Sequence, residues 1–390
     1  MDTLLELYDA REPLLNVSGA WRLKPRCVVC FYDALEDVRR ERGKLADMLR
    51  QLGVNAQVRM EQLDGRDGQA LTRWVEKHQE ELGEWGIEIC GGDEVMLFMA
   101  GCCHARFGCP VYARRPDHQY FSLPEGRLFG EISGGFTVEQ RLSLYGGRLE
   151  RYGRLTPKDL TLKLITLSGM LLGLQKAHPQ LWTRQTRCLQ GVVSRAPEDA
   201  LEVLLTAEQC QKNGFSPRKG HVFRQMQRCG ALTAVRVTEE GLLLTFPSAL
   251  IRDCLCDYGV WLEIYVYGAM KQSGAFDDVR MSCVVRWEGD RAVNELDVVA
   301  TAGLGLAVCS CKTCAPDMEA LAELNVITRG FGSDYAVSLM ACLPKGSDRM
   351  DGASARGEEL DIRTVDVRQY EWDGLVAYFR RLGKRLQAMV

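Results

Sequence analysis

Short apolar runs alternate with amphipathic segments over the first third of this chain, and that alternation limits the folds it can adopt. Four runs have the length of buried strands: residues 26–32, 55–60, 87–90 and 109–113. The segments between them carry apolar residues at a helical period: residues 33–52, 69–81 and 94–106. A further strand is expected at residues 118–123. Strands alternating with helices through short connections predict a doubly wound, Rossmann-like α/β domain, whose ligands bind at the carboxyl ends of the strands.

Two loops are expected at that carboxyl edge. One follows the strand at residues 26–32, and the other is the Gly91-Gly92-Asp93 turn that opens the helix at residues 94–106. Glycines let backbone N–H groups approach a phosphate, and a helix N-terminus favours an anion. Tyr32 can stack on a base, while Asp93 fits a helix cap. The alternative is a tight turn without a ligand. The candidate ligand-binding residues are Tyr32, Asp33, Ala34, Gly91, Gly92 and Asp93.

A helical segment at residues 157–177 begins a different pattern. Two helices are expected at residues 199–212 and 217–229, followed by a hairpin over residues 232–246. Helix, turn, helix and hairpin is the layout of a winged helix. The second helix carries four cations: Arg218, Lys219, Arg224 and Arg228. The module is therefore either a nucleic-acid contact or a linker without one.

The C-terminal third holds the residues that point to chemistry. Glu263 lies in a helix expected over residues 249–272, and strands are expected at residues 279–287, 292–301 and 304–313. Strand side chains alternate, so Glu295 shares a face with Asp297, and Ser310 with Lys312. A hairpin turning at residues 302–303 would bring Asp297 close to Lys312.

Carboxylates beside a lysine suit metal-assisted cleavage of a phosphodiester. Mg²⁺ and Mn²⁺ prefer carboxylate oxygens, and a lysine can orient water or stabilise developing charge. The candidate metal ligands are Glu263, Glu295 and Asp297, and the candidate catalytic set adds Ser310 and Lys312. The alternative interpretation is that these are surface charges at strand ends.

Composition and charge argue against several classes of protein. A net charge of −3 over 390 residues argues against a globally basic nucleic-acid binder but leaves a local basic groove open. No apolar run reaches membrane-spanning length, and the acidic start lacks a leader pattern, so a cytoplasmic protein is expected. The sixteen cysteines lie mostly in apolar runs, which predicts reduced, buried thiols. Cys27 and Cys30 would face opposite sides of a strand, which disfavours a zinc site.

These motifs carry a resemblance. Residues 259–313 resemble the PD-(D/E)xK nuclease domain of CRISPR ancillary proteins, through Trp261-Leu262-Glu263, Asn294-Glu295-Leu296-Asp297 and Lys312-Thr313. The N-terminal part is similar to a CARF domain, a sensor of cyclic oligoadenylates, through residues 89–96 (ICGGDEVM) and 109–112 (CPVY). We therefore expect three domains: a CARF sensor at 1–145, a helical linker with a winged-helix-like module at 146–255, and an α/β restriction-endonuclease-like domain at 256–390.

The resemblance implies a cyclic-oligoadenylate-activated nuclease of type III CRISPR antiviral defence. A CARF homodimer would bind cyclic tetra-adenylate, and the nuclease domains would use Mg²⁺ or Mn²⁺ to cleave single-stranded DNA or RNA. One position departs from the family motif, because Ser310 stands where the family has an acid two residues before the lysine. Two alternatives stay open: a nucleotide-responsive nucleic-acid-binding regulator with an inactive nuclease fold, and a CARF domain that degrades its own activator.

Overall fold

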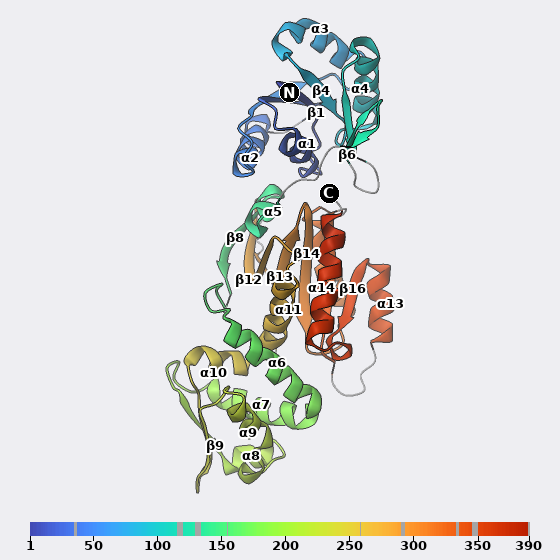
Figure 1. Cartoon of the computed structure of the whole chain (residues 1–390). Helices are drawn as coiled ribbons and strands as arrows, with labels where there is room; N and C mark the ends of the chain where they lie inside the picture. The colour runs from blue at the N-terminus through green and yellow to red at the C-terminus, as the bar shows by residue number, and fades with distance from the viewer. Residues whose placement is uncertain are drawn as a thin grey trace.

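The structure is a computed structural model of the 390-residue chain. It describes residues 1–34, 37–114, 120–128, 134–153, 155–257, 259–289, 293–332, 335–344 and 350–388. An N-terminal α/β domain occupies one end of an elongated molecule, a C-terminal α/β domain occupies the centre, and a helical module occupies the other end (Figure 1). None of the helices in the described residues combines the length and apolar character that a membrane span requires.

The N-terminal domain is the doubly wound α/β domain that the sequence predicts. Its strands are β1 (Thr3–Leu7), β2 (Cys27–Tyr32), β3 (Gln57–Gln62), β4 (Trp85–Glu88), β5 (Val111–Arg114), β6 (Tyr120–Leu123) and β7 (Arg127–Leu128). The helices are α1 (Leu15–Leu23), α2 (Val38–Gln51), α3 (Ala70–Leu82) and α4 (Glu94–Phe107). The order is β3-β2-β1-β4-β5-β6-β7, and the first five strands are parallel. Residues 118–119 of the predicted last strand lie outside the described residues.

The sequence analysis missed β1, which is the middle one of the five parallel strands. β1 pairs with both β2 and β4, so the strand order reverses between β1 and β4. In doubly wound sheets the crevice at such a reversal is where ligands bind. The loops after β1, β2 and β4 therefore share the expected binding edge.

The cysteines follow the sequence prediction. All sixteen are free, and most are buried. Cys30 belongs to the core under α1 and α2, whereas Cys27 packs against the core on the α3 and α4 side. The two thiols therefore face opposite sides of β2, as the strand spacing predicts.

The helical module begins with α6 (Leu162–Ala177) and α7 (Pro179–Val193) and ends with α10 (Ala249–Cys256). Between them lie β9 (Glu202–Thr206), α8 (Ala207–Lys212), the 3₁₀ turn η1 (Pro217–Lys219), α9 (His221–Arg228), β10 (Ala234–Val237) and β11 (Gly241–Thr245). The predicted hairpin is β10–β11, and β9 extends it into a three-stranded antiparallel sheet. The helix predicted at residues 199–212 is instead β9 followed by α8. Val203 and Leu205 alternate into the core, and Thr206 caps α8.

The C-terminal domain is a six-stranded mixed sheet between helices. Its elements are α11 (Val260–Ser273), β12 (Asp278–Trp287), β13 (Val293–Ala302), β14 (Gly305–Lys312), α12 (Met318–Arg329), β15 (Ala336–Cys342), α13 (Asp351–Glu359), β16 (Ile362–Asp366), the 3₁₀ turn η3 (Val367–Gln369) and α14 (Trp372–Gln387). The order is β16-β15-β14-β13-β12-β8. The helix predicted at residues 249–272 is two helices, α10 and α11.

The edge strand β8 (Gly147–Tyr152) corrects one predicted boundary. The sequence analysis assigns residues from 146 onward to a linker, but β8 pairs antiparallel with β12 and so belongs to the C-terminal sheet. The preceding helix α5 (Val138–Leu144) connects it to the N-terminal domain. Pairing across more than 130 residues leaves no local pattern in the sequence, which is why the boundary was misplaced.

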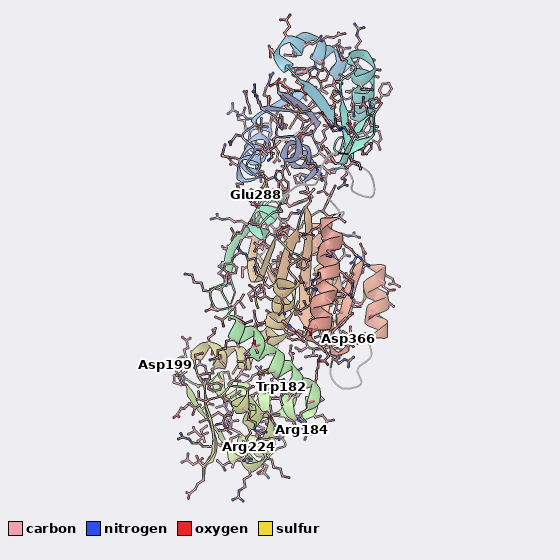
Figure 2. All side chains as sticks on the ribbon, in the orientation of Figure 1. Trp182, Arg184, Asp199, Arg224, Glu288 and Asp366 are labelled. Atoms are coloured by element: carbon pink, nitrogen blue, oxygen red, sulfur yellow. The ribbon has the colours of Figure 1, made fainter. Side chains whose placement is uncertain are left out.

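The N-terminal and C-terminal domains meet in a polar and an apolar contact. Glu288, labelled in Figure 2, pairs with Lys44 of α2 (Nζ to Oε2, 2.7 Å) and with Arg40. Leu304 and Tyr335 of the C-terminal domain are buried in the same core as Trp21 of α1. The two domains are therefore packed directly on each other.

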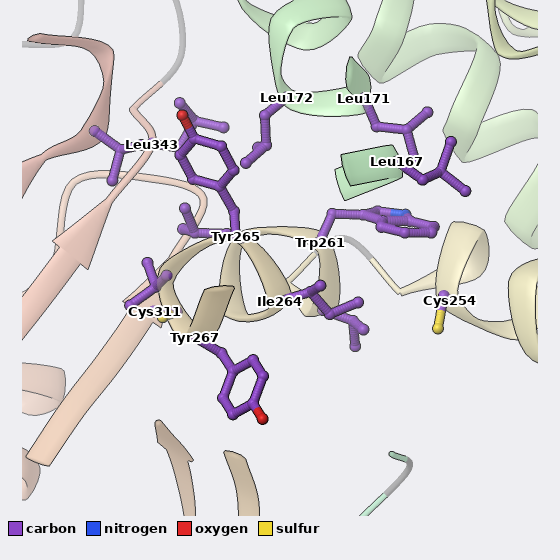
Figure 3. Close-up of a cluster of buried hydrophobic side chains, with 14 of the residues drawn as sticks. Leu167, Leu171, Leu172, Cys254, Trp261, Ile264, Tyr265, Tyr267, Cys311 and Leu343 are labelled. Atoms are coloured by element: carbon purple, nitrogen blue, oxygen red, sulfur yellow. The ribbon is translucent and has the colours of Figure 1, made fainter. Parts of the chain in front are cut away.

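The helical module and the C-terminal domain share a continuous apolar core. Leu167 and Leu171 of α6 lie over Trp261 of α11, and the same core continues through the module's sheet and the C-terminal sheet (Figure 3). Trp261 is only 2% exposed. Because no solvent layer separates the two parts, the module is held in a set position relative to the C-terminal sheet.

A buried carboxyl pair in the N-terminal domain predicts a pH dependence of stability. Glu6 and Glu88 are 1% and 2% exposed, and the Tyr120 hydroxyl donates to Glu88 Oε1 at 2.6 Å. Burial raises the pKa of Glu6 well above its usual range, and the Glu88 charge raises it further. A raised carboxyl pKa means that the folded state holds a proton that the unfolded chain releases. The proton on Glu6 therefore contributes fully to stability below about pH 4.3, the pKa of glutamate in the unfolded chain. This contribution is lost as the pH rises through the higher pKa that Glu6 has in the folded protein.

We expect Glu6→Gln, which is neutral at every pH, to stabilise the protein at pH 8 by on the order of 1–2 kcal/mol. The gain should shrink toward pH 4.5. Thermal melts of the full chain at the two pH values measure it, with the exposed Glu80→Gln as control. An equal gain at both values would mean that Glu6 does not carry the effect.

Candidate active site and nucleotide pocket

The β13–β14 hairpin brings together the residues that the sequence analysis paired. The strands are antiparallel, with Val298 opposite Cys309. One step further out, Asp297 Oδ2 accepts a hydrogen bond from Ser310 Oγ at 3.1 Å and another from the Cys311 backbone N–H at 2.7 Å. The predicted antiparallel hairpin is confirmed, and Ser310 and Cys311 hold the Asp297 carboxylate in place.

A cavity of about 120 Å³ lies in front of this hairpin, between β13, β14 and α12. Its charged and hydroxyl-bearing lining residues are Glu295, Asp297, Ser310, Lys312 and Glu323. Glu323 comes from α12 and was not a sequence candidate. Three carboxylates, a hydroxyl and one ammonium therefore face one small space.

The surroundings of the Asp297 carboxyl have opposing effects on its pKa. Burial raises its pKa above the usual range and the Glu295 charge adds to this, while the Cys311 N–H, the Lys312 ammonium and the Ser310 hydroxyl act in the other direction. The net shift is upward. A further positive charge in the cavity would favour the ionised form, so the site suits a cationic ligand.

Backbone strain lies directly beside Asp297. Ser282 of β12 is 3% exposed and has a φ of 50°, in the left-handed region that non-glycine residues rarely adopt. Met281 packs on the α11 side of the sheet and Cys283 on the α12 side, so Ser282 reverses the usual alternation. Strained residues of this kind concentrate at functional sites.

Gly153 stabilises this arrangement. Its backbone N–H donates to the Ser282 carbonyl at 2.6 Å. A Cβ at residue 153 would lie 2.3 Å from Glu295 Oε1, so a larger residue there would displace the Glu295 carboxylate from this position. The sequence analysis did not identify either residue, because both act through backbone geometry.

Glu263 does not line the cavity. It is half-buried near the start of α11, whose apolar side chains pack with Val298 and Cys309 on one face of the sheet. The α12 residues Leu321 and Leu324 pack with Leu296 and Val308 on the other face. The role of Glu263 as a metal ligand stays a prediction. Glu323, which the sequence analysis did not name, lines the cavity instead.

The donor chemistry of the cavity fits a hard cation, although the described side chains do not converge on one. No group of three or more His, Cys, Asp or Glu residues within the described ranges is placed to hold a metal ion. One Asp297 oxygen already accepts two hydrogen bonds, whereas Glu295 and Glu323 are exposed and can rotate. Carboxylate oxygens are the ligands that Mg²⁺ and Mn²⁺ prefer. The metal stays a prediction.

A second, larger cavity lies at the carboxyl edge of the N-terminal sheet. It measures about 530 Å³, and its walls are the loops after β1, β2 and β4. Its lining residues are Tyr8, Asp9, Ala10, Arg11, Tyr32, Asp33, Ala34, Gly92, Asp93, Glu94, Met96 and Leu97. Five of the six predicted ligand-binding residues are among them.

Gly91, the sixth, lies behind the wall. A Cβ there would lie 2.4 Å from the Leu7 carbonyl oxygen, so glycine is needed for the β4 loop to pass close to β1. Gly92 has a φ of 81°, which also requires glycine. The Gly-Gly pair therefore shapes the cavity by close backbone packing.

Two carboxylates of this cavity accept hydrogen bonds from backbone N–H groups close by in the sequence. Asp93 accepts from the Met96 N–H at 2.8 Å as a helix cap, and Asp9 accepts from the Arg11 N–H at 2.8 Å. Arg11 is the only cation in the described lining. The sequence analysis missed it because the loop after β1 was not recognised as part of the binding edge.

Three comparisons with known proteins bear on this arrangement. Residues 255–366 match the family described as Card1-like, endonuclease domain. The fold is similar to that of protein VC1899 from Vibrio cholerae, with 18% identity and a TM-score of 0.78 over 99% of this chain and 98% of that chain. It is also similar to Can2 from Sulfobacillus thermosulfidooxidans, solved in complex with cyclic tetra-adenylate, with 17% identity and a TM-score of 0.69 over 99% of both chains. No curated protein matches the sequence. The match over residues 255–366 confirms the predicted resemblance of this part to an endonuclease domain, and the similar structures confirm the predicted fold.

Proposed function

We infer from the Card1-like endonuclease domain at residues 255–366 that this chain is a nuclease activated by cyclic oligoadenylate in type III CRISPR defence. We propose that it cleaves single-stranded DNA or RNA with Mg²⁺ or Mn²⁺. The observation that carries the proposal is the cavity that joins Asp297, Glu295 and Lys312 within this domain.

The residues of the cavity would have different roles in phosphodiester cleavage. Glu295, Asp297 and Glu323 would hold the metal, which when bound polarises the phosphate and activates water. The Lys312 ammonium stabilises negative charge on the phosphate oxygens. Ser310 and the Cys311 N–H orient Asp297, so the serine at the family's acid position serves the carboxylate instead of replacing it.

Glu323 is expected to supply part of what the acid missing at residue 310 would provide. We expect Glu323→Gln to lower the cleavage rate at limiting Mn²⁺ by roughly 10–100-fold, with partial recovery at high Mn²⁺. Glu319→Gln on the same helix is the matched control, because Glu319 is exposed and does not line the cavity. Equal Mn²⁺ dependence in both variants would remove Glu323 from the site.

The N-terminal cavity is proposed to bind cyclic tetra-adenylate in a homodimer. Phe98 of α4 is 62% exposed, Val95 is 41% exposed, and Leu97 is 39% exposed while also lining the cavity. An exposed apolar patch beside the cavity supports a dimer in which the two cavities meet. Tyr32 supplies a ring for stacking on a base, and Arg11 supplies the charge for a phosphate.

A contact between the cavity and the nuclease domain supports allosteric activation. The loop that carries Asp9 and Arg11 continues to Glu12, whose Oε1 accepts a hydrogen bond from the Tyr145 hydroxyl. Tyr145 follows α5 and lies two residues before β8, the edge strand of the C-terminal sheet. A ligand that moves this loop would thus act on the strand next to β12, which carries Ser282 beside Asp297.

Arg11→Ala should weaken cyclic tetra-adenylate binding by about tenfold or more, because a charge-assisted hydrogen bond to phosphate is lost. Isothermal titration calorimetry on the full chain measures this. Arg42→Ala is the control, since Arg42 is exposed in the same domain and outside the cavity. Unchanged affinity in the Arg11 variant would place the phosphate elsewhere.

The test of the proposed function is a cleavage assay with purified protein on labelled single-stranded DNA and RNA. Mg²⁺ or Mn²⁺ and cyclic tetra-adenylate are added separately and together. Cleavage that needs both would support the sensor, the nuclease and their coupling. Nucleotide binding without cleavage would favour the alternative of a regulator with an inactive nuclease fold.

A further inference from the structure

The helix α9 of the module presents a polar, basic face to solvent. Val222, Phe223 and Met226 are buried, whereas His221, Arg224 and Arg228 are exposed at spacings of three and four residues. Residues at those spacings lie on one side of a helix. The outward side of α9 therefore carries two arginines one turn apart, Arg224 and Arg228.

Further cations surround the start of α9. Arg218 and Lys219 are exposed in η1, and the Arg218 carbonyl accepts a hydrogen bond from Arg224. Arg184 of α7 is exposed and lies beside Gly214, in the turn that connects α8 to η1. We call these five residues the basic face: Arg184, Arg218, Lys219, Arg224 and Arg228. Figure 2 labels Arg184 and Arg224.

The basic face is separated from the acids at the hairpin tip. None of the ion pairs found among the described residues includes a member of the basic face. The acids Glu239 and Glu240 lie at the hairpin tip, where the Ala207 N–H at the start of α8 donates to the Glu240 carbonyl. The basic face begins beyond the other end of α8, so the two kinds of charge do not neutralise each other.

Hydrogen bonds hold the basic face in a fixed position on the rest of the protein. Gln185 of α7 is fully buried, accepts from the Val222 N–H at 3.0 Å and donates to the Lys219 carbonyl at 3.2 Å, which fixes the start of α9. The Lys176 ammonium of α6 donates to the Val367 and Tyr370 carbonyls of the C-terminal domain. A preorganised cationic surface loses little entropy when it binds a rigid polyanion.

We propose that the basic face binds the backbone of duplex DNA, with α9 in the major groove. An α-helix with its side chains is about 10–12 Å across, and the major groove of B-form DNA is about 12 Å wide. The deep, narrow major groove of double-stranded RNA does not admit side chains, and a single strand offers no groove. The inference goes beyond the proposed function and does not depend on the nuclease site or the nucleotide pocket.

A cleft between the module and the C-terminal domain lies between the basic face and the domain proposed to cleave nucleic acid. It measures about 200 Å³ and is lined on one side by Lys176 and Thr183 and on the other by Leu343 and Arg368. The Leu343 N–H donates to the Lys312 carbonyl at 2.8 Å, so the cleft lies beside the end of β14, the strand that carries Lys312. Duplex held on α9 would keep an adjoining strand near the nuclease domain.

The test is fluorescence anisotropy with full-length Lys312→Ala protein, without divalent metal or cyclic nucleotide, on a labelled DNA duplex of about 24 base pairs. Arg224→Glu/Arg228→Glu should weaken binding at least about tenfold and reduce the slope of log K against log salt by about 2. Arg42→Glu/Lys77→Glu carries the same charge change on exposed N-terminal positions and should bind like the parent.

Single-stranded DNA and duplex RNA of the same sequence are the competing probes, and both should bind more weakly than the DNA duplex. Equal losses in the two double variants would overturn the proposal, because general charge would then explain binding. Tighter binding of single strands would also overturn it. Since the assay involves no cleavage, its failure would leave the nuclease proposal standing.

Discussion

Replacing Lys312 by alanine is expected to lower nucleic-acid cleavage by at least about 100-fold, because one preorganised charge-stabilising group is typically worth that much in the transition state. Lys312 is half-buried in the cavity with Asp297 and Glu295, and no other lysine or arginine among the described residues lines it. Cyclic tetra-adenylate binding should be unchanged, since the cavity proposed to bind it lies in another domain. Single-turnover cleavage with saturating activator and metal measures the effect.

The exposed Lys271→Ala on α11 is the matched control and should cleave like the parent. A second variant, Lys312→Arg, keeps the charge but enlarges the head group and should recover only part of the rate. Full activity in Lys312→Ala would contradict the site assignment. Loss of nucleotide binding in the same variant would indicate misfolding and not lost chemistry.

Replacing Trp261 by alanine is expected to destabilise the protein by about 3–5 kcal/mol, the usual cost of removing a large aromatic side chain from a core. Trp261 is 2% exposed and lies against Leu167 and Leu171 of the module (Figure 3). Since this core is continuous, the module and the C-terminal domain should lose structure in the same transition. The melting temperature should fall by on the order of 10 °C.

Differential scanning calorimetry of the full chain measures that shift. Leu162→Ala is the control, because Leu162 of α6 is 77% exposed and should change the melting temperature little. If the Trp261→Ala protein instead showed one unchanged transition and one lowered transition within this region, the module and the C-terminal domain would be independent folding units.

Much of the candidate site could be predicted because it is local in sequence. Asp297 and Lys312 lie on two strands joined by a tight turn, so antiparallel pairing across that turn brings them close together. The Gly91-Gly92 pair and the Asp93 cap likewise depend on neighbouring residues. Arg11 and Glu323 were missed, because each reaches its cavity from an element whose position depends on the folded sheets.

The sequence by itself determined the α/β class, the hairpin with its carboxylates and lysine, and the cationic side of α9, since each follows from periodicity over short distances. The tertiary structure alone decided that β1 lies in the middle of the five parallel strands, that β8 is an edge strand of the C-terminal sheet, and that Glu323, not Glu263, lines the cavity. The physical reason is that strand order and the face that a helix covers are set by burial and backbone pairing between distant residues, which leave no periodic signal in the chain.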